Sequence, residues 1–456
     1  MSDEVRIDNR QLYKVLAKIA VPISIQGVVS ATLTLVDNLM CGFLGETELA
    51  AVGIATQIYF IHYLLLFGFT GGAATFMAQF YGAGELKNIR RTTGFAITVM
   101  LIVAAVFFIP GFIFTEEFLG IYTADPELIA MAVPYMRIAT PVFFLTAVSI
   151  PLEMAFKSTH QTKVPMIVSV VVFTTNATLN YILIFGKFGA PALGVAGAAI
   201  GTTVARILEL CINIFFAARK SNVFYGNIRE YFNWNREMMT RILKNSAPTT
   251  LNEVFWSIGQ SMYVAAFARL GTTAYAGYQA ARSIYNIFAF AAYSMGDATL
   301  ILVGKTIGEG KKEETWLLAR KLLRIGLVVG GVIGVMQIAF SWPLVNLFGL
   351  TALGKKYAFY ILIVDGILLS VNLYNGMSVT GVMRSGGDTK FAMISECSCV
   401  WFIAVPVAFI TALVFHLPVH ICVLAMKLEE FVKAAILKKR FYSRKWINVV
   451  IGGLEK

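Results

Sequence analysis

Long apolar segments recur from one end of this 456-residue chain to the other. Many reach about 18 residues or more, the length that lets a helix cross a hydrocarbon core about 30 Å thick. Lipid offers the backbone no hydrogen bonds, so a segment that crosses it alone must be helical. The short alternating segments of a membrane β-barrel are absent. The sequence therefore predicts an all-α membrane protein.

Composition agrees with this class and argues against a nucleic-acid partner. Charged residues make up only 14% of the chain, against about 25% in soluble domains. The net charge is +12, but membrane proteins collect Lys and Arg on their cytoplasmic loops. The five cysteines show no spacing typical of a metal or redox site.

Twelve transmembrane helices are predicted, with boundaries uncertain by several residues. Basic residues gather on alternate connections and at both ends of the chain, so we expect both termini in the cytoplasm, at the cell's inner membrane. The predicted spans are 17–41, 48–80, 92–115, 127–155, 163–186, 195–218, 244–269, 275–304, 316–349, 356–383, 391–415 and 417–437.

The second half of the sequence repeats the first. A shift of 226 residues aligns Lys18 with Lys244 and Pro22 with Pro248, and no gap is needed as far as Gly82 and Gly308. Six spans in each half make two parallel six-helix lobes, related by a pseudo-two-fold axis along the membrane normal. The predicted divisions are an N-terminal lobe at 1–218, a polar cytoplasmic linker at 219–243, a C-terminal lobe at 244–437 and a basic tail at 438–456.

Polar residues inside the first-half spans are candidate sites, because an ionisable group at the bilayer centre costs about 2.5–3.5 kcal/mol. Asp37 lies deep in the first span without a basic neighbour in sequence, so it could take up a proton or bind sodium. Asn176 and Asn180 share one helix face, and Thr202 lies on the next span. Their oxygens suit a small cation beside one carboxylate, although interhelical hydrogen bonding would use the same groups.

Further polar residues are candidates for substrate or ion contact. Glu253 and Gln260 share a face of the seventh span, Asp297 lies on the eighth, and Gln57 on the second. Asp365 is a weaker candidate, because it could lie near the outer surface. By contrast, Arg206 and Glu209 are three apart and are expected to form a structural ion pair with each other.

No catalytic constellation is present in the sequence. It contains four histidines without an HExxH motif and no GxxxxGK[ST] motif, so neither an enzyme nor direct ATP-driven transport is indicated.

Several motifs resemble the multidrug and toxic compound extrusion (MATE) family along nearly the whole chain. The first half contains LTLVDNLMCGFLGETELAAVGIATQIYF, FMAQFYGAGE and NATLNYILIFGKFG followed by GVAGAAIGT; the second contains APTTLNEVFWSIGQSMY and GVMRSGGDTKF. The resemblance implies a twelve-helix, two-lobe antiporter that exports organic, often cationic compounds in exchange for protons or sodium. Small organic substrates and membrane lipids would then be its partners, and we expect a monomer without a cofactor.

The resemblance also assigns roles to individual residues. Asp37 matches the first-span acid used for cation coupling, and Asn176, Asn180 and Thr202 match the residues around it. Position 180 is Asp in many members and Asn here, which leaves the coupling ion and its stoichiometry open. In the second half, Glu253 falls about a turn earlier than the corresponding Glu of one branch. The alternatives are a flippase for a lipid-linked precursor and, from other classes, a membrane enzyme or passive channel.

Overall fold

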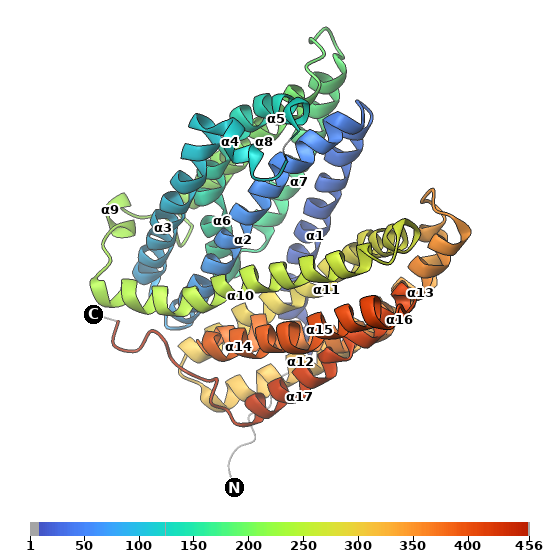
Figure 1. Ribbon diagram of the computed structural model, residues 1–456. Coiled ribbons are helices and arrows are strands. Elements are labelled where there is room, and N and C mark those ends of the chain that lie inside the picture. Colours follow the sequence, from blue (N-terminus) through green and yellow to red (C-terminus); the bar gives the residue numbers. More distant parts are fainter. Residues whose placement is uncertain (1–8, 124, 455–456) are drawn as a thin grey trace.

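The computed structural model describes residues 9–123 and 125–454, and within these ranges the secondary structure is helical (Figure 1). The first lobe consists of α1 (Asn9–Gly42), α2 (Glu46–Gly82), α3 (Leu86–Ile113), α4 (Thr115–Gly120), α5 (Pro126–Ala139), α6 (Val142–Ser158), α7 (Lys163–Phe185) and α8 (Val195–Ala217). A connection with the short α9 (Ile228–Tyr231) leads to the second lobe.

The second lobe begins with three long helices and ends with broken ones. Its elements are α10 (Arg236–Ala268), α11 (Thr272–Gly308), α12 (Lys312–Val345), α13 (Ala352–Gly376) with η1 (Met377–Met383), α14 (Thr389–Cys399) with η2 (Val400–Ala404), α15 (Val405–Phe409), η3 (Ile410–Val414), α16 (Val419–Lys427) and α17 (Glu429–Tyr442). The η segments are π-helical, and such widened turns are frequent at functional sites.

The predicted all-α architecture of twelve spans in two lobes is confirmed. Nine helices among the described residues are each long and apolar enough to cross a membrane, and the bent pair α5–α6 makes a tenth. The pair bends by 49° beside Pro141, whose ring prevents a continuous helix, and together the two helices cover the predicted span 127–155. The other two predicted spans correspond to α10 and to α16–α17, and α17 carries the buried charged residues Glu429, Glu430 and Lys433.

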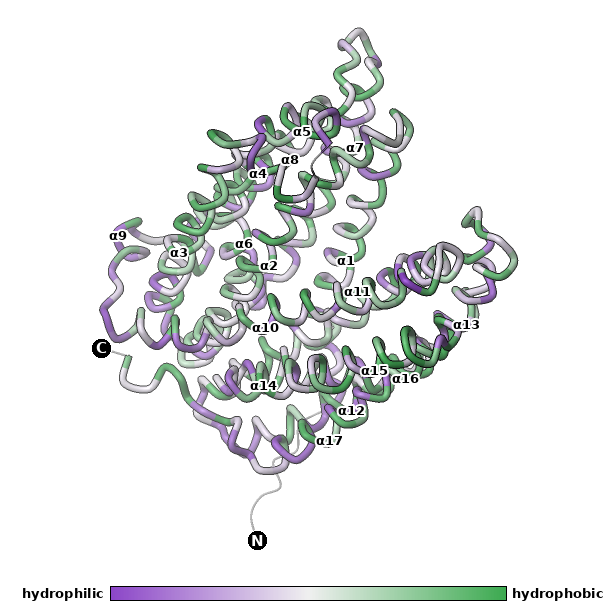
Figure 2. The backbone as a smooth tube through the Cα atoms, in the orientation of Figure 1, coloured by the Kyte–Doolittle hydropathy of each residue, from purple (hydrophilic) through white to green (hydrophobic). Residues whose placement is uncertain are grey.

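Helices also extend into two segments predicted to be a linker and a tail. The α10 helix begins at Arg236, within the predicted linker, and α17 ends at Tyr442, within the predicted tail. The four-part division of the chain remains a prediction. Hydrophilic residues concentrate at α9 and at the helix ends near the two termini (Figure 2).

Residues that are equivalent in the sequence repeat make equivalent contacts between the lobes. A Cβ atom on Gly82 would clash with the backbone of Lys305, and one on Gly308 would clash with the backbone of Gln79. A shift of 226 residues relates Gly82 to Gly308 and Gln79 to Lys305. The α2–α11 contact is therefore the same contact made twice, as expected at a two-fold axis.

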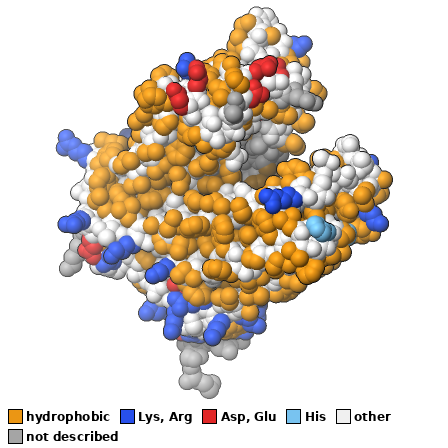
Figure 3. Space-filling model, in the orientation of Figure 1, with side chains coloured by type: hydrophobic (Ala, Val, Ile, Leu, Met, Phe, Trp, Pro, Cys, Tyr) orange, Lys and Arg blue, Asp and Glu red, His pale blue; other side chains and the backbone are white. Residues whose placement is uncertain are grey.

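The lobes meet on the side of the molecule where the labels N and C mark the two ends of the chain, called here the terminus side (Figure 1). There, Asn245 donates a hydrogen bond to the Gly72 carbonyl at 2.9 Å and Thr249 to the Gly68 carbonyl at 2.7 Å. Away from this side the lobes separate, and the space-filling view shows a recess between them (Figure 3). The molecule is therefore closed on the terminus side and open on the opposite side.

The last described residues, 443–454, form a strap across the terminus side of both lobes (Figure 1). Trp446 is fully buried in a core with second-lobe helices, whereas Ile451 and Leu454 join the main core of the first lobe. Gln79 on α2 donates to the Asn448 carbonyl at 3.0 Å and accepts from the Val450 amide at 2.9 Å. The strap thus links the two lobes through both packing and hydrogen bonds.

Candidate ion-coupling and substrate sites

Three helices of the first lobe bring together the polar residues predicted around Asp37. Asp37 lies on α1, Asn176 and Asn180 on one face of α7, and Thr202 on α8. Gly201 lies against the Asn180 amide, where a Cβ atom would clash with the amide oxygen. The small residue therefore lets α7 and α8 approach closely at the polar cluster.

These four side chains form one chain of hydrogen bonds. Asn180 Nδ2 donates to Asp37 Oδ1 at 2.8 Å and to Asn176 Oδ1 at 3.0 Å. Asn176 Nδ2 donates to Thr202 Oγ1 at 3.2 Å. The structure brings the four predicted residues together, and their role in transport remains a prediction.

Two features distinguish this cluster from simple helix-packing contacts. Asp37 makes no ion pair within the described part of the chain, and the nearest cationic influence is Arg206 on α8. The buried Asn180 Oδ1 has no hydrogen-bond partner among the described residues. A partly exposed carboxylate beside a free amide oxygen and a hydroxyl can accept a proton or a small hard cation.

Tyr135 on α5 is a member of this neighbourhood that the sequence did not indicate. It is 5% exposed, and its hydroxyl lies near Asp37 and Thr202. Its position on the bent helix pair decides its proximity, and no local pattern in the sequence signals that bend angle. Within the described residues, no group of three or more His, Cys, Asp or Glu side chains could hold a metal ion.

The second-half acids lie elsewhere, near the contact between the lobes. Glu253 forms a 2.6 Å ion pair with Arg384 of η1's C-terminal flank, and both side chains are largely buried. Asp297 on α11 pairs across the lobes with Lys157 on α6 at 3.8 Å. Each predicted acid therefore has a cationic partner, unlike Asp37.

Charged residues of both lobes act on the hydroxyl of Tyr63 on α2. The charges that act on its hydroxyl are those of Glu153, Asp297, Arg206 and Glu253. The sequence analysis proposed Glu253 and Asp297 as contacts but did not single out Glu153. Only the packing of α2, α6, α8, α10 and α11 brings these residues together.

Three other predictions concern residues outside these groups. Gln57 and Gln260 make no side-chain hydrogen bond within the described chain, so the structure joins neither to the Asp37 cluster. Asp365 is buried among side chains and pairs with Lys427 at 3.0 Å. The predicted Arg206–Glu209 ion pair is present, at 2.5 Å.

A separate charge cluster lies inside the second lobe at the break between α16 and α17. Lys433 contacts Glu429 at 3.1 Å and Glu430 at 3.4 Å, and all three side chains are buried. Asn375 donates to Glu430 at 2.7 Å. The Lys433 ammonium partly compensates the two carboxylates, which lowers the cost of these charges in the last span.

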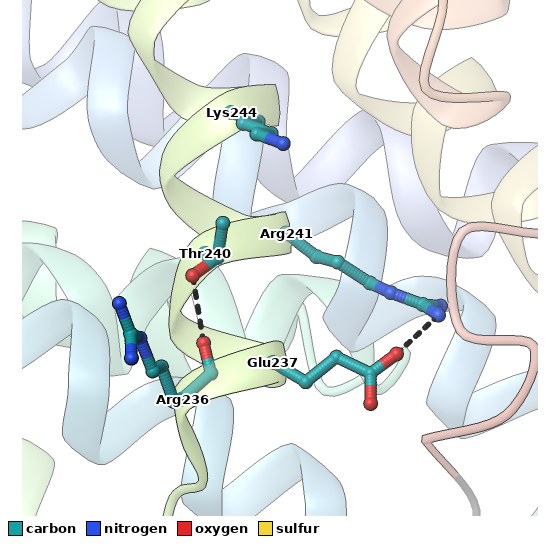
Figure 4. Close-up of a pocket in the computed structure, with 5 residues that line it drawn as sticks. All are labelled: Arg236, Glu237, Thr240, Arg241 and Lys244. Carbon is teal, nitrogen blue, oxygen red and sulfur yellow. Dashed lines mark hydrogen bonds and ion pairs between the residues drawn. The ribbon is translucent and has the colours of Figure 1, made fainter.

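A surface hollow lies at the start of α10, far along the chain from the Asp37 cluster (Figure 4). It measures about 480 Å³ and is lined by Arg236, Glu237, Thr240, Arg241 and Lys244. Arg241 pairs with Glu237 at 2.5 Å. We assign no transport role to this hollow, because it is a shallow, basic surface feature.

The comparisons with known proteins decide the family. The MatE family model matches residues 22–182 and again residues 248–410. The chain is a MATE family transporter. The two matches start 226 residues apart, the same shift that relates the halves of the sequence. Members of this family are transporters, so this MATE protein is an integral membrane transporter and not an enzyme.

Curated relatives resemble this MATE transporter over nearly their whole length. It is 24% identical to the probable multidrug resistance protein YoeA of Bacillus subtilis, over 88% of this chain and 87% of that protein. It is 23% identical to the probable multidrug resistance protein NorM of Thermotoga maritima, over 96% and 93% respectively.

Solved structures confirm the two-lobe fold of this MATE transporter. A crystal structure of MATE in complex with MaL6 has a TM-score of 0.86 at 18% identity, covering 96% of this chain and all of that one. An outward-facing multidrug resistance MATE transporter of the MOP superfamily has a TM-score of 0.85 at 18% identity, covering 97% of this chain and all of that one. At this identity the likeness concerns the fold alone.

Proposed function

We propose that this MATE protein is a secondary antiporter that exports organic, often cationic compounds in exchange for protons or sodium ions. The observation that carries the proposal is the cluster of Asp37, Asn180, Asn176 and Thr202. Within the described ranges, it combines a carboxylate that forms no ion pair with an amide oxygen that accepts no hydrogen bond. The curated relatives described as multidrug resistance proteins support the substrate class.

In this proposal the transporter works by alternating access. The recess between the lobes receives ions from the side opposite the termini, and Asp37 binds one of them. Rocking of the lobes would then separate the terminus-side contacts, including the Lys157–Asp297 ion pair. The cation is released there and the substrate enters the cavity.

We further propose that the terminus side faces the cytoplasm and that the protein acts as a monomer. Lys and Arg side chains gather on this side in the space-filling view (Figure 3). Basic residues concentrate on cytoplasmic loops of membrane proteins. Protons or sodium ions would then move from the open recess toward the basic side, while the organic substrate is exported in the opposite direction.

Transport by purified protein in proteoliposomes tests this function. The measurement is efflux of the organic cation ethidium under an imposed proton or sodium gradient. We expect wild type and the control Glu116→Gln, which changes an exposed residue of α4, to show gradient-dependent efflux. Asp37→Asn should fall to the level of empty liposomes while remaining folded. Undiminished, ion-dependent efflux by Asp37→Asn would refute the coupling role.

The flippase alternative is not favoured. The matching family and the relatives described as multidrug resistance proteins point to export of small organic compounds instead. Translocation of a lipid-linked sugar by the same proteoliposomes would reverse this preference.

A further inference from the structure

A second acidic group lies inside the first lobe, separate from Asp37. Glu153 on α6 is adjacent to Glu209, Arg206 and Asn213 of α8 and accepts a 2.8 Å hydrogen bond from Gln26 Nε2 of α1. Glu209 and Asn213 are buried, with 3% and 0% exposure. Three helices therefore converge on Glu153.

The cations around Glu153 are bound to other acids. Arg206 pairs with Glu209 at 2.5 Å, and Lys157 pairs with Asp297 of the second lobe at 3.8 Å. Glu153 itself forms no ion pair within the described residues. No cation therefore contacts the Glu153 carboxylate directly in the part of the chain that the structure describes.

Two amide oxygens beside this carboxylate lack hydrogen-bond partners. Asn213 lies within hydrogen-bonding reach of Glu153, and its buried amide oxygen has no partner in the described structure. The buried Gln26 Oε1 also lacks a partner there. A buried polar group without a partner is unfavourable, so a bound cation that contacts these oxygens would offset that cost.

We infer that Glu153, Asn213 and Gln26 form a second binding site for a small hard cation, either a proton or a sodium ion. Carboxylate and amide oxygens are suitable ligands for such an ion. This inference rests on the proposed antiport function and adds to it a site at which the ion resides on its way out of the first lobe.

The position of the site gives it a place in the transport cycle. Thr202 of the Asp37 cluster and Asn213 are 11 positions apart on α8, which corresponds to roughly 16 Å along a helix. Arg206 lies between them. Glu153 is one helical turn from Lys157, whose ion pair with Asp297 joins the lobes. The cation moves from Asp37 past Arg206 to Glu153 and leaves when the lobes part on the terminus side.

Cation binding by the full-length protein in nanodiscs tests the inference. Equilibrium binding of radioactive sodium is measured together with proton uptake, followed by a pH indicator in weakly buffered solution. We expect wild type to bind the cation at two sites and Asp37→Asn to keep the site that depends on Glu153. Glu153→Gln should lose that second site, which means that the cation affinity of the site falls at least about tenfold. The double variant should lose both sites in the same sense.

Matched variants separate ligation from folding. Asn213→Leu should weaken binding at the second site, whereas Asn213→Asp, which keeps a side-chain oxygen, should retain it. Glu116→Gln, an exposed Glu on α4, serves as the control, and thermal unfolding identifies variants that no longer fold. A sodium signal that depends on Glu153 identifies a sodium site, and proton uptake alone identifies a proton site; either supports the inference.

Wild-type cation binding by folded Glu153→Gln and Asn213→Leu overturns the inference. That result leaves the proposed function standing if Asp37→Asn abolishes coupled efflux. Conversely, normal efflux by Asp37→Asn defeats the proposed function, while the Glu153-dependent binding remains measurable in that same variant. The two failures are therefore distinguishable.

Discussion

At the scale of single residues, the acids inside the membrane spans differ in whether a cation contacts them. Among the described residues, Asp37 and Glu153 accept hydrogen bonds from amides and form no ion pair, whereas Glu253 and Asp297 each contact a cation. A carboxylate with a fixed cation is already neutralised, which makes it a poor receptor for a second cation. These contacts support the proposed ion coupling in the first lobe, and they predict a structural role for the Glu253–Arg384 pair.

A double-variant cycle tests the structural role of that pair. Arg384→Gln leaves Glu253 buried without its cation, which should reduce stability by about 3–5 kcal/mol. Adding Glu253→Gln should restore part of the loss, because no uncompensated charge remains. Thermal unfolding in detergent provides the measurement. A double variant that is no more stable than Arg384→Gln alone would contradict the assignment.

His160, in the connection between α6 and α7, gives the protein a pH-dependent stability. Burial, with help from the Lys305 and Lys18 charges, lowers the pKa of His160 to about 4, while Glu309 opposes the shift. Above pH 6.5 the imidazole is neutral in both folded and unfolded chains. As the pH falls toward 4 only the unfolded chain takes up the proton, so stability should decrease, by at most about 3 kcal/mol.

The histidine variants keep the backbone conformation comparable. His160 has a φ of 63° and His416 a φ of 47°, and Asn tolerates this left-handed region. His160→Asn should flatten the dependence of the melting temperature on pH between 7 and 4. His416→Asn, which changes an exposed histidine, should leave it unchanged. Equal slopes for wild type and His160→Asn would show that another group is responsible.

At the scale of helices, glycine decides how closely α2 and α11 approach. Gly82 and Gly308 sit against backbone of the opposite helix, so any side chain there would force the lobes apart on the terminus side. By contrast, Gly53 on the same α2 helix faces open space. In the proposed alternating-access cycle, this is the contact that opens and closes on the terminus side.

Replacement of Gly82 by Ala should shift the protein toward the state that is open on the terminus side. Overpacking of this kind costs about 1–3 kcal/mol. Pulsed EPR distances between labels at Lys87→Cys and Lys312→Cys, two exposed positions at the starts of α3 and α12, report the separation. The native cysteines are replaced by alanine in all these proteins. Gly53→Ala should match the parent; an unchanged distance in Gly82→Ala would contradict the predicted effect.

At the scale of the whole molecule, the C-terminal strap connects the two hydrophobic cores. Trp446→Ala should weaken its attachment to the second lobe, since truncating a buried Trp costs about 3–5 kcal/mol. The label distance across the terminus side should then lengthen or broaden. Val449→Ala, which changes a strap residue that is 40% exposed, should have little effect. A wild-type distance distribution in Trp446→Ala would exclude a role for the strap in closure.

The sequence by itself determined the membrane class, the number of spans and the two-fold repeat. Apolar length and Gly–Pro spacing are local properties, so they can be read without knowledge of packing. The four residues of the Asp37 cluster could also be predicted from the sequence, because Asn176 and Asn180 share a helix face and the family resemblance joins them to Asp37 and Thr202.

Only the tertiary structure decided which residues from distant spans meet. Tyr135, Glu153 and the Asp365–Lys427 pair each depend on the rotation and bend of helices that are far apart in sequence. A periodic pattern identifies a polar face but not the helix that faces it. For the same reason, neither the burial of Trp446 nor the strap to which it belongs could be predicted, because the sequence of this segment is typical of a basic tail.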